Sequence, residues 1–478
     1  MLDGKPADSP LHGIARSLTA PEAVDYRYTV ADFNAVDRFL DLATRATARE
    51  PETAETRRET LLKLARLLTK HTTELVALLV RDAGFTVSEA DEEILTAADA
   101  CRYYEWLAVQ PGFEDGTRPT PLGVIAVVPS RVHPLAEAVA DIAAAWVTGN
   151  TILYKPAQHS ILIGHRLAAL CAEAGMTAPA LQIVPCLDNQ MAEKLLADPR
   201  VDALCAHANA EHTAAWARRV PQRPLFGGTP GQPTVYLASG CDWQSAIRTL
   251  IPALFRRSGQ DAAQPHLILV HAALYDNQAF MNALRDAATG LTALPGRVEG
   301  GTVASLARRP EPEELELLRT DTQEGVWLVP PHRAEEMDSL LFTPGIRIGL
   351  GPQSVFSLAA HNVPAIGLIR VQDTVDAIVL QRERARGFAA VLFSQDKDEI
   401  ALWSREIQVA CRGINDVPMV IPELNANHIE VIETQRKRLG TKKGFIAVKP
   451  NCSIQSYVPA LTPLLGFGIK YINVCTYQ

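Results

Sequence analysis

A cysteine near the end of the chain is a candidate nucleophile. Cys452 lies in KPNCSIQSYVP, residues 449–459, between the apolar run GFIAVK and a segment expected to be helical. In the first turn of a helix, free backbone N–H groups and the positive end of the dipole lower a thiol pKa and favour the reactive thiolate. A cysteine in such a place is also often just a small buried residue. On this stretch alone both interpretations stay open.

The other cysteines and the histidines give no sign of a metal or disulfide framework. The eight cysteines are scattered, with no CxxC pair and no regular spacing, which favours a reducing, cytosolic setting. His207, His212 and His266 have no second ligand at metal spacing, so we interpret them as surface or packing histidines. No metal site is therefore expected.

Composition limits the classes of partner. The chain has 478 residues and a formal charge of -8, and this mild acidity gives no electrostatic reason to expect nucleic acid. The polar N-terminus MLDGKPADSPLHG does not read as a signal peptide, and no apolar run approaches the ~18 residues of a membrane span. We expect a cytoplasmic protein without membrane contact.

The elements that must position any site follow from the apolar patterning. Residues 30–107 show helical spacing, with one pattern ending on Gly84 as a C-cap. Short apolar runs then alternate with helical segments, and the strands are expected in PLGVIAVVPS, TILYKP, LQIVPC, VDALCAHA, HLILVHAALYD, VPAIGLIRV and FAAVLFS. Such alternation predicts an α/β fold with doubly wound parallel sheets.

Four parts are expected along the chain. Residues 1–29 are interpreted as an irregular segment, 30–240 as a cofactor-binding-like α/β lobe and 241–415 as a catalytic-like α/β lobe. Residues 416–478 stand apart as a short strand-helix-strand segment that holds Cys452.

Most of the chain resembles the aldehyde dehydrogenase superfamily. The similarity is carried by the stretch from PLGVIAVVPS through GNTILYKPAQHS, then by LFGGTPGQPTVY, FRRSGQDAAQPHLILV and ARGFAAVLFSQDKDEI. It runs from roughly residue 40 to residue 415, and the CRYY and FRRSGQ stretches are most similar to the semialdehyde dehydrogenases of proline breakdown. The resemblance implies an aldehyde or semialdehyde as substrate and NAD or NADP as cofactor.

The resemblance also implies a thiolate, an oxyanion-binding asparagine and a base glutamate, and this chain departs from all three. The nucleophile position after Gly-Gln is Ala262, the base position before the Gly-Gly pair is Leu225, and the oxyanion position is Val132. A methyl group and two branched alkyl groups can neither attack a carbonyl nor donate a hydrogen bond to an oxyanion. By this alignment the family's chemistry is lost.

Cofactor residues of the family survive in part. Lys155 and Gln158 stand in YKPAQ as the candidate cofactor-binding residues. The ribose-binding glutamate maps to Ala360. The Gly-Ser pair of the phosphate turn maps to Ala208 and Asn209, so a Cβ stands where the family's backbone approaches phosphate closely. Nicotinamide dinucleotide binding is left open.

The tail resembles a second family, aspartate-semialdehyde dehydrogenase. The resemblance rests on VIPE-N, QR, GFI, PNCS and the closing TYQ, within residues 416–478. It implies Cys452 as nucleophile, Asn451 beside it and Gln478 as a substrate-orienting residue. That family's glycine-rich loop is not seen here, and its histidine base, substrate arginine and dimer region would lie beyond Gln478.

Three hypotheses follow. The chain is a degenerate aldehyde dehydrogenase retained for binding or scaffolding, an active NAD(P)-dependent semialdehyde dehydrogenase that uses Cys452, or a fusion of two gene pieces. A homo-oligomer is compatible with the first family, although the family's C-terminal oligomerisation segment has no counterpart in this sequence.

Overall fold

The computed structural model describes most of the chain up to residue 416. The described residues are 9–16, 18, 23–48, 52–109, 120–187, 190–208, 210–227, 231–261, 264–294, 302–319, 324–333, 340–359, 362–409 and 411–416. All of them fall in the compact unit that runs from residue 1 to residue 420. No helix in this part of the chain has the length and apolar character needed to cross a bilayer.

Helices dominate the first hundred residues, as the apolar spacing predicts. They are α1 (Phe33–Thr47), α2 (Ala54–Lys70), α3 (Thr72–Ala83) and α4 (Val87–Leu107). Gly84 ends α3 with φ +72°, which confirms its predicted role as a C-cap. The pattern expected as one helix is divided at His71, where the backbone leaves helical geometry between α2 and α3.

The segment expected to be irregular over residues 1–29 contains a two-stranded antiparallel sheet instead. It consists of β1 (His12–Arg16) and β2 (Val24–Thr29). In β1 the buried face is Gly13 and Ala15, whereas Ile14 faces outward. Because its buried side chains are so small, this strand lacks the apolar alternation that would have predicted it.

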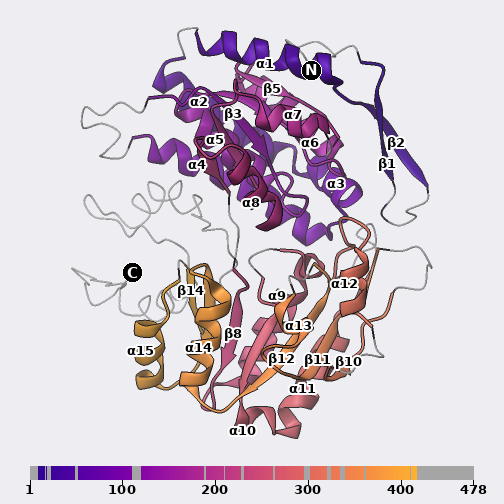
Figure 1. Ribbon diagram of the computed structural model, residues 1–478, viewed down its shortest axis with the longest axis vertical. Helices are drawn as coiled ribbons and strands as arrows, with labels where there is room; N and C mark the ends of the chain where they lie inside the picture. The colour runs from indigo at the N-terminus through magenta and orange to yellow at the C-terminus, as the bar shows by residue number, and fades with distance from the viewer. Residues whose placement is uncertain are drawn as a thin grey trace, which may run out of the picture. The chain divides into compact units, whose positions relative to one another are not determined.

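A five-stranded parallel sheet forms the first lobe, residues 33–227 (Figure 1). Its order is β5-β4-β3-β6-β7, with β3 (Val124–Val128), β4 (Thr151–Tyr154), β5 (Leu181–Ile183), β6 (Ala203–Ala206) and β7 (Leu225–Phe226). The crossover helices are α5 (Ala136–Val147), α6 (Ile161–Ala174), α7 (Gln190–Ala197) and α8 (Ala210–Arg219). The expected doubly wound sheet is confirmed.

A seven-stranded sheet forms the second lobe, residues 231–416. Its order is β10-β11-β12-β9-β8-β13-β14, and only the pair β10–β11 is antiparallel. The strands are β8 (Thr234–Leu237), β9 (Leu267–His271), β10 (Val326–Val329), β11 (Gly345–Leu350), β12 (Ala365–Val371), β13 (Ala389–Phe393) and β14 (Cys411–Ile414). The sheets therefore change between Phe226 and Thr234, slightly before the division expected at residue 240.

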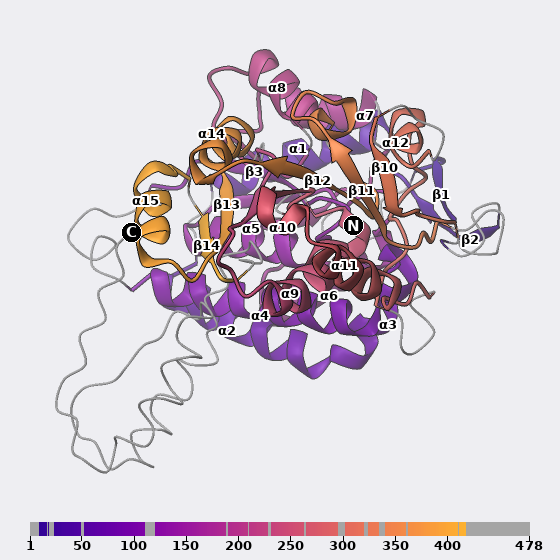
Figure 2. The same cartoon turned by 90° about the horizontal axis from the view of Figure 1, so that it is seen from below.

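Helices cover both faces of the second sheet (Figure 2). Those on one face are α9 (Trp243–Phe255), α10 (Ala272–Tyr275) and α11 (Gln278–Thr289). On the other face are α13 (Val355–Leu358), α14 (Thr374–Ala385) and α15 (Lys397–Glu406), and α12 (Pro312–Leu317) contributes Leu317 to the same core. A 3₁₀ turn, η1 (Arg256–Gly259), follows α9.

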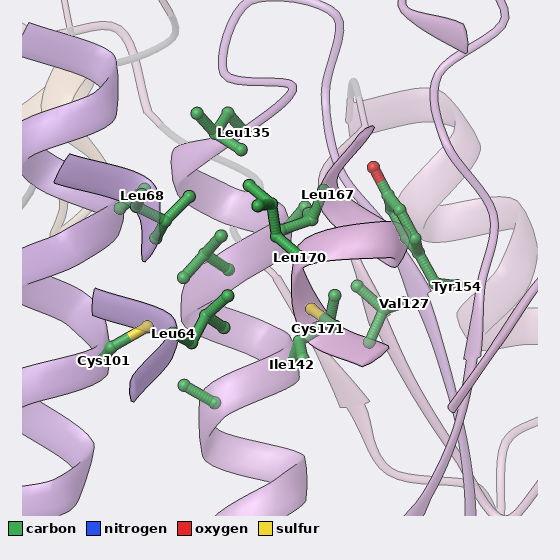
Figure 3. Close-up of a cluster of buried hydrophobic side chains, with 14 of the residues drawn as sticks. Leu64, Leu68, Cys101, Val127, Leu135, Ile142, Tyr154, Leu167, Leu170 and Cys171 are labelled. Carbon is green, nitrogen blue, oxygen red and sulfur yellow. The ribbon is translucent and has the colours of Figure 1, made fainter. Parts of the chain in front are cut away.

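The core of the first lobe lies on both faces of its sheet because the strand side chains alternate. Ile125 and Val127 of β3 pack toward α2, α4 and α6, whereas Val124, Ala126 and Val128 pack toward α1 and α7. Figure 3 shows the first of these two clusters, in which leucines of α2 and α6 surround the thiols of Cys101 and Cys171. The strands are buried on both faces, which is why they read as continuous apolar runs.

Candidate functional site

The carboxyl ends of the first-lobe strands bring several predicted residues to one edge. Val132 follows β3, Lys155 follows β4 and Ala208 follows β6, whereas Leu225 lies at the amino end of β7. The strand order reverses between β3 and β6, since β4 and β5 lie on one side and β7 on the other. Ligands of doubly wound folds bind in the crevice at such a switch point. This edge is therefore the place to look for a cofactor site.

The candidate cofactor residues are enclosed. The backbone N–H of Lys155 donates to the carbonyl of Val127 at 2.9 Å, and its side chain is 2% exposed. Gln158 is half-buried, and its carbonyl accepts a hydrogen bond from the hydroxyl of Tyr28 at 3.5 Å. The structure thus places both residues beyond β4, as predicted, but leaves the ammonium of Lys155 little open surface.

His207, interpreted from the sequence as a packing or surface histidine, belongs to a charged cluster at the same edge. Its Nε2 lies 2.9 Å from Oδ2 of Asp141, and its Nδ1 lies 3.6 Å from Oε1 of Glu137. Glu137 also accepts a hydrogen bond from the N–H of Ser130 at 2.7 Å. Burial lowers the pKa of His207, but the bond to Asp141 and the charge of Glu137 outweigh it and raise the pKa to about 9.

The other two histidines do behave as interpreted. His212 is exposed and lies against the ring of Trp216, and His266 is half-buried. Within the described part of the chain, no three His, Cys, Asp or Glu side chains gather in a way that could hold a metal ion.

A small polar pocket lies where the first-lobe loop after β3 meets the second lobe. It encloses about 280 Å³, part of it open to solvent, and its lining is Arg131, Val132, Gln260, Leu306, Arg308, Pro310, Glu314 and Asn362. Val132, at the oxyanion position, thus faces the same pocket as Gln260, which precedes the nucleophile position 262 by two residues. The assignment of Val132 to the oxyanion position stays a prediction.

The polar groups of the pocket are largely bonded to one another. Arg308 makes two bonds of 2.7 Å to the carboxylate of Glu314, which also accepts from Nδ2 of Asn362 at 2.9 Å. Gln260 donates to the carbonyl of Arg257 at 2.8 Å and accepts from the N–H of Ala307 at 2.9 Å. These bonds fix the shape of the pocket.

Behind the pocket, a buried network of charges joins the two lobes. Arg257 of the second lobe donates to Oε2 of Glu93 on α4 at 2.7 Å and to the carbonyl of Val132. His133 lies 3.1 Å from Oε2 of Glu93 through Nδ1 and 3.0 Å from Oδ2 of Asp261 through Nε2. Arg257, Glu93 and His133 are all buried. The loops that flank the pocket are therefore tied to each other by charge pairs.

The charges of this network shift each other's pKa. Burial would raise the pKa of Glu93, but Arg257 and His133 outweigh it and lower the pKa to about 2. Burial and Arg257 lower the pKa of His133, whereas Asp261 and Glu93 outweigh them and raise it to about 10. Each ion is thus stabilised by an opposite charge inside the protein.

The backbone of η1 is held in an unusual conformation by the same network. Arg257, Ser258 and Gly259 all have positive φ, at 48°, 55° and 69°. The N–H of Arg257 donates to Oε1 of Glu89 at 2.6 Å, and a Cβ on Gly259 would lie 2.6 Å from the carbonyl oxygen of Val363. Left-handed residues of this kind persist where their surroundings fix them. Here the contacts with Glu89 and Val363 fix the backbone of residues 257–259, just before position 262.

The thiols of the described residues lie elsewhere. Cys101, Cys171, Cys186, Cys205 and Cys241 are buried, Cys411 is half-buried, and none of the six lines the pocket. Burial raises the pKa of Cys171 and of Cys241 to about 12, so these thiols stay protonated and unreactive. Figure 3 shows Cys101 and Cys171 among core leucines.

Several predicted site residues lie outside the described residues, so their placement stays a prediction. These are the nucleophile of the tail and its neighbours, Cys452, Asn451 and Gln478, and the aldehyde dehydrogenase motif positions Ala262, Asn209 and Ala360. Leu225, at the base position, is half-buried on β7 and does not line the pocket.

Comparison with known proteins identifies the family. The model of the aldehyde dehydrogenase family matches residues 19–427. The chain belongs to the aldehyde dehydrogenase family. The match also covers residues 416–427, which the sequence assigned to the second resemblance; the comparisons do not support that resemblance, and it remains a prediction.

Relatives in sequence include several semialdehyde enzymes. The bifunctional protein PutA of Salmonella typhimurium is 29% identical over 208 residues, which cover 42% of this chain and 16% of PutA. The non-phosphorylating aspartate-semialdehyde dehydrogenase of Halomonas elongata is 24% identical and covers 77% of both chains. The match to PutA thus spans a small part of that protein.

Solved structures of the family share the fold. A 1-pyrroline-5-carboxylate dehydrogenase from Thermus with bound NAD aligns at a TM-score of 0.80 with 20% identity, over 88% of this chain and 85% of the other. PutA from Bdellovibrio bacteriovorus aligns at a TM-score of 0.81 with 19% identity, over 88% of this chain and 46% of the other.

The family and the fold imply a nicotinamide dinucleotide as cofactor. The residues at the switch-point edge decide whether such a ligand fits. The side chain of Lys155 is enclosed, Ala208 stands before α8 at the position predicted for the family's glycine, and two carboxylates lie beside His207. A dinucleotide needs close backbone approach and positive or neutral surroundings for its pyrophosphate. The described residues do not fit this group.

Sequence reasoning missed the buried network. Glu93, His133, Arg257 and Asp261 were not among the candidate residues. The available signal was the pair of arginines in FRRSGQ beside a glycine, together with the acidic helix EADEEI. Charged residues flanking a motif that lies in a core need buried partners.

Proposed function

We propose that this protein is a catalytically degenerate member of the aldehyde dehydrogenase family that has kept the fold for binding or scaffolding. The observation that carries the proposal is the pocket lining, which includes Val132 and Gln260 and no thiol of the described residues. The sequence continues from Gln260 to Ala262, an alanine at the position of the nucleophile.

The residues at the three substituted positions cannot perform the steps of aldehyde oxidation. A methyl group cannot attack the aldehyde carbon, so no thiohemiacetal forms and no hydride leaves by that route. The isopropyl group of Val132 cannot donate a hydrogen bond to a developing oxyanion, and Leu225 cannot activate water. Since catalytic groups act as a unit, loss of the nucleophile alone removes most of the activity.

The test is aldehyde oxidation by the full chain. The purified protein is mixed with NAD⁺ or NADP⁺ and succinate semialdehyde, aspartate semialdehyde or 1-pyrroline-5-carboxylate, and the reduced nicotinamide is followed from the first turnover. A 1-pyrroline-5-carboxylate dehydrogenase from Thermus serves as the positive control. We expect neither a burst nor turnover above that of the matched variant Cys452→Ala.

The alternative function makes the opposite prediction. If Cys452 is the nucleophile of an active semialdehyde dehydrogenase, a burst of reduced nicotinamide appears and the variant Cys452→Ala abolishes it. That result would overturn the proposal of degeneracy. Slower iodoacetamide labelling of Cys452 than of the other thiols would count against this alternative.

A further inference from the structure

Hydrogen bonds and ion pairs join three segments at the switch point, the ends of β3 and β6 and the helix α5. The N–H of His207, just after β6, donates to the carbonyl of Val128 at the end of β3, at 2.9 Å. The ring of the same residue contacts Asp141 and Glu137 of α5. Glu137 in turn accepts from the N–H of Ser130, after β3. The imidazole thus ties the end of β6 to α5, and Glu137 ties the end of β3 to the same helix.

The bridge is held in place rather than loosely exposed. The side chains of His207, Glu137 and Asp141 are 27%, 19% and 18% exposed. Burial raises the pKa of Glu137, and the charge of His207 partly offsets this effect. Both ring nitrogens of His207 face carboxylate oxygens, so the imidazole is committed to the bridge.

The neighbouring positions along the edge leave no cradle for phosphate. Between β6 and α8 the chain has His207, Ala208 and Asn209, with no glycine that would let a backbone approach a pyrophosphate closely. On the β4 side, Lys155 is enclosed at 2% exposure. The carboxylates of Glu137 and Asp141 are more exposed than Lys155, so the charge open to a ligand with two negative charges is unfavourable.

From this arrangement we infer that the switch-point crevice does not hold a nicotinamide dinucleotide, because His207, Asp141 and Glu137 place two carboxylates at its edge and no glycine lies between β6 and α8. The inference goes beyond the proposed function. A protein without a catalytic thiolate can still bind its cofactor, whereas this crevice has lost the binding step itself.

The test is direct binding without any aldehyde. The full chain is titrated with NADH and NADPH, and fluorescence of the reduced nicotinamide reports binding, with the Thermus 1-pyrroline-5-carboxylate dehydrogenase as positive control. We expect no saturation at concentrations about tenfold above those that saturate the control enzyme. Saturable binding that AMP displaces would overturn the inference while leaving the proposal on catalysis intact.

An isosteric variant tests the role of the bridge. Glu137→Gln with Asp141→Asn removes two negative charges and keeps the side-chain shapes, so we expect NADH affinity to rise at least about tenfold. The matched control, Glu316→Gln with Asp286→Asn, makes the same charge change on exposed positions of the second lobe and should leave binding unchanged. Circular dichroism confirms that each variant is folded. A folded crevice variant that binds no better than the native chain contradicts the role assigned to the bridge.

Discussion

The raised pKa of His207 makes the stability of the folded protein depend on pH. Its pKa is raised to about 9, so the folded protein binds a proton there more tightly than the unfolded chain, whose histidines titrate near 6.5. Stability from this proton is therefore fully present below about pH 6.5 and is lost as the pH rises through about 9. Burial lowers this pKa, and the bond to Asp141 together with the charge of Glu137 raises it by more.

The variant His207→Gln should remove this pH dependence. We expect it to lower the urea midpoint most at about pH 6, and the difference from the native protein to vanish above about pH 9. The control His212→Gln changes an exposed histidine outside this cluster and should lower the urea midpoint less than His207→Gln at about pH 6. A His207→Gln effect that stays constant from about pH 6 to about pH 10 would show that the imidazole is not charged in the fold.

At the scale of elements, the end of α3 depends on one glycine. Gly84 has φ +72°, and a Cβ added there would lie 2.9 Å from Cδ1 of Leu18 and 3.1 Å from Cβ of Ser305. Gly84→Ala should therefore lower the free energy of unfolding by at least about 1 kcal/mol, from the left-handed backbone alone. The matched control is Gly240→Ala, where a Cβ meets nothing within 4 Å. Thermal or urea unfolding followed by circular dichroism measures both, and equal losses would rule out a special role for this cap.

The elements that the sequence could predict are those whose pattern is local. Gly84 and the strands β3, β4, β9 and β12 were predicted because a glycine punctuates a helix and buried strands read as apolar runs. The division at His71 was missed because the apolar spacing continues through it. β1 was missed because Gly13 and Ala15 form its buried face.

The candidate site was predictable only where a motif follows a strand. Val132 and Lys155 could be placed because the ends of parallel strands share one edge. The pair Arg257–Glu93 could not, since 164 residues separate its members and only the packing of the two lobes brings them together. Such contacts leave no periodic signal in one sequence.

At the scale of the described molecule, the buried network makes the two lobes depend on each other. Arg257 is 3% exposed and reaches from the second lobe to Glu93, Val132 and His133 of the first. Removing one member of a buried ion pair leaves the other charge without compensation, which typically costs about 3–5 kcal/mol. Loss of one member should therefore destabilise the segments of both lobes that meet at the network.

The variant Arg257→Leu tests this dependence. We expect the free energy of unfolding to fall by about 3–5 kcal/mol, and hydrogen exchange to quicken both in the loop 130–135 of the first lobe and in the segment 256–261 of the second. In Glu93→Gln the same two segments should be affected, and the double variant should cost less than the sum of the single ones, because the partners act together. The control Arg319→Gln breaks an exposed pair with Glu316 and should change neither segment. If Arg257→Leu loosened the second lobe alone, the two lobes would be stabilised independently and the network would be a local feature of η1.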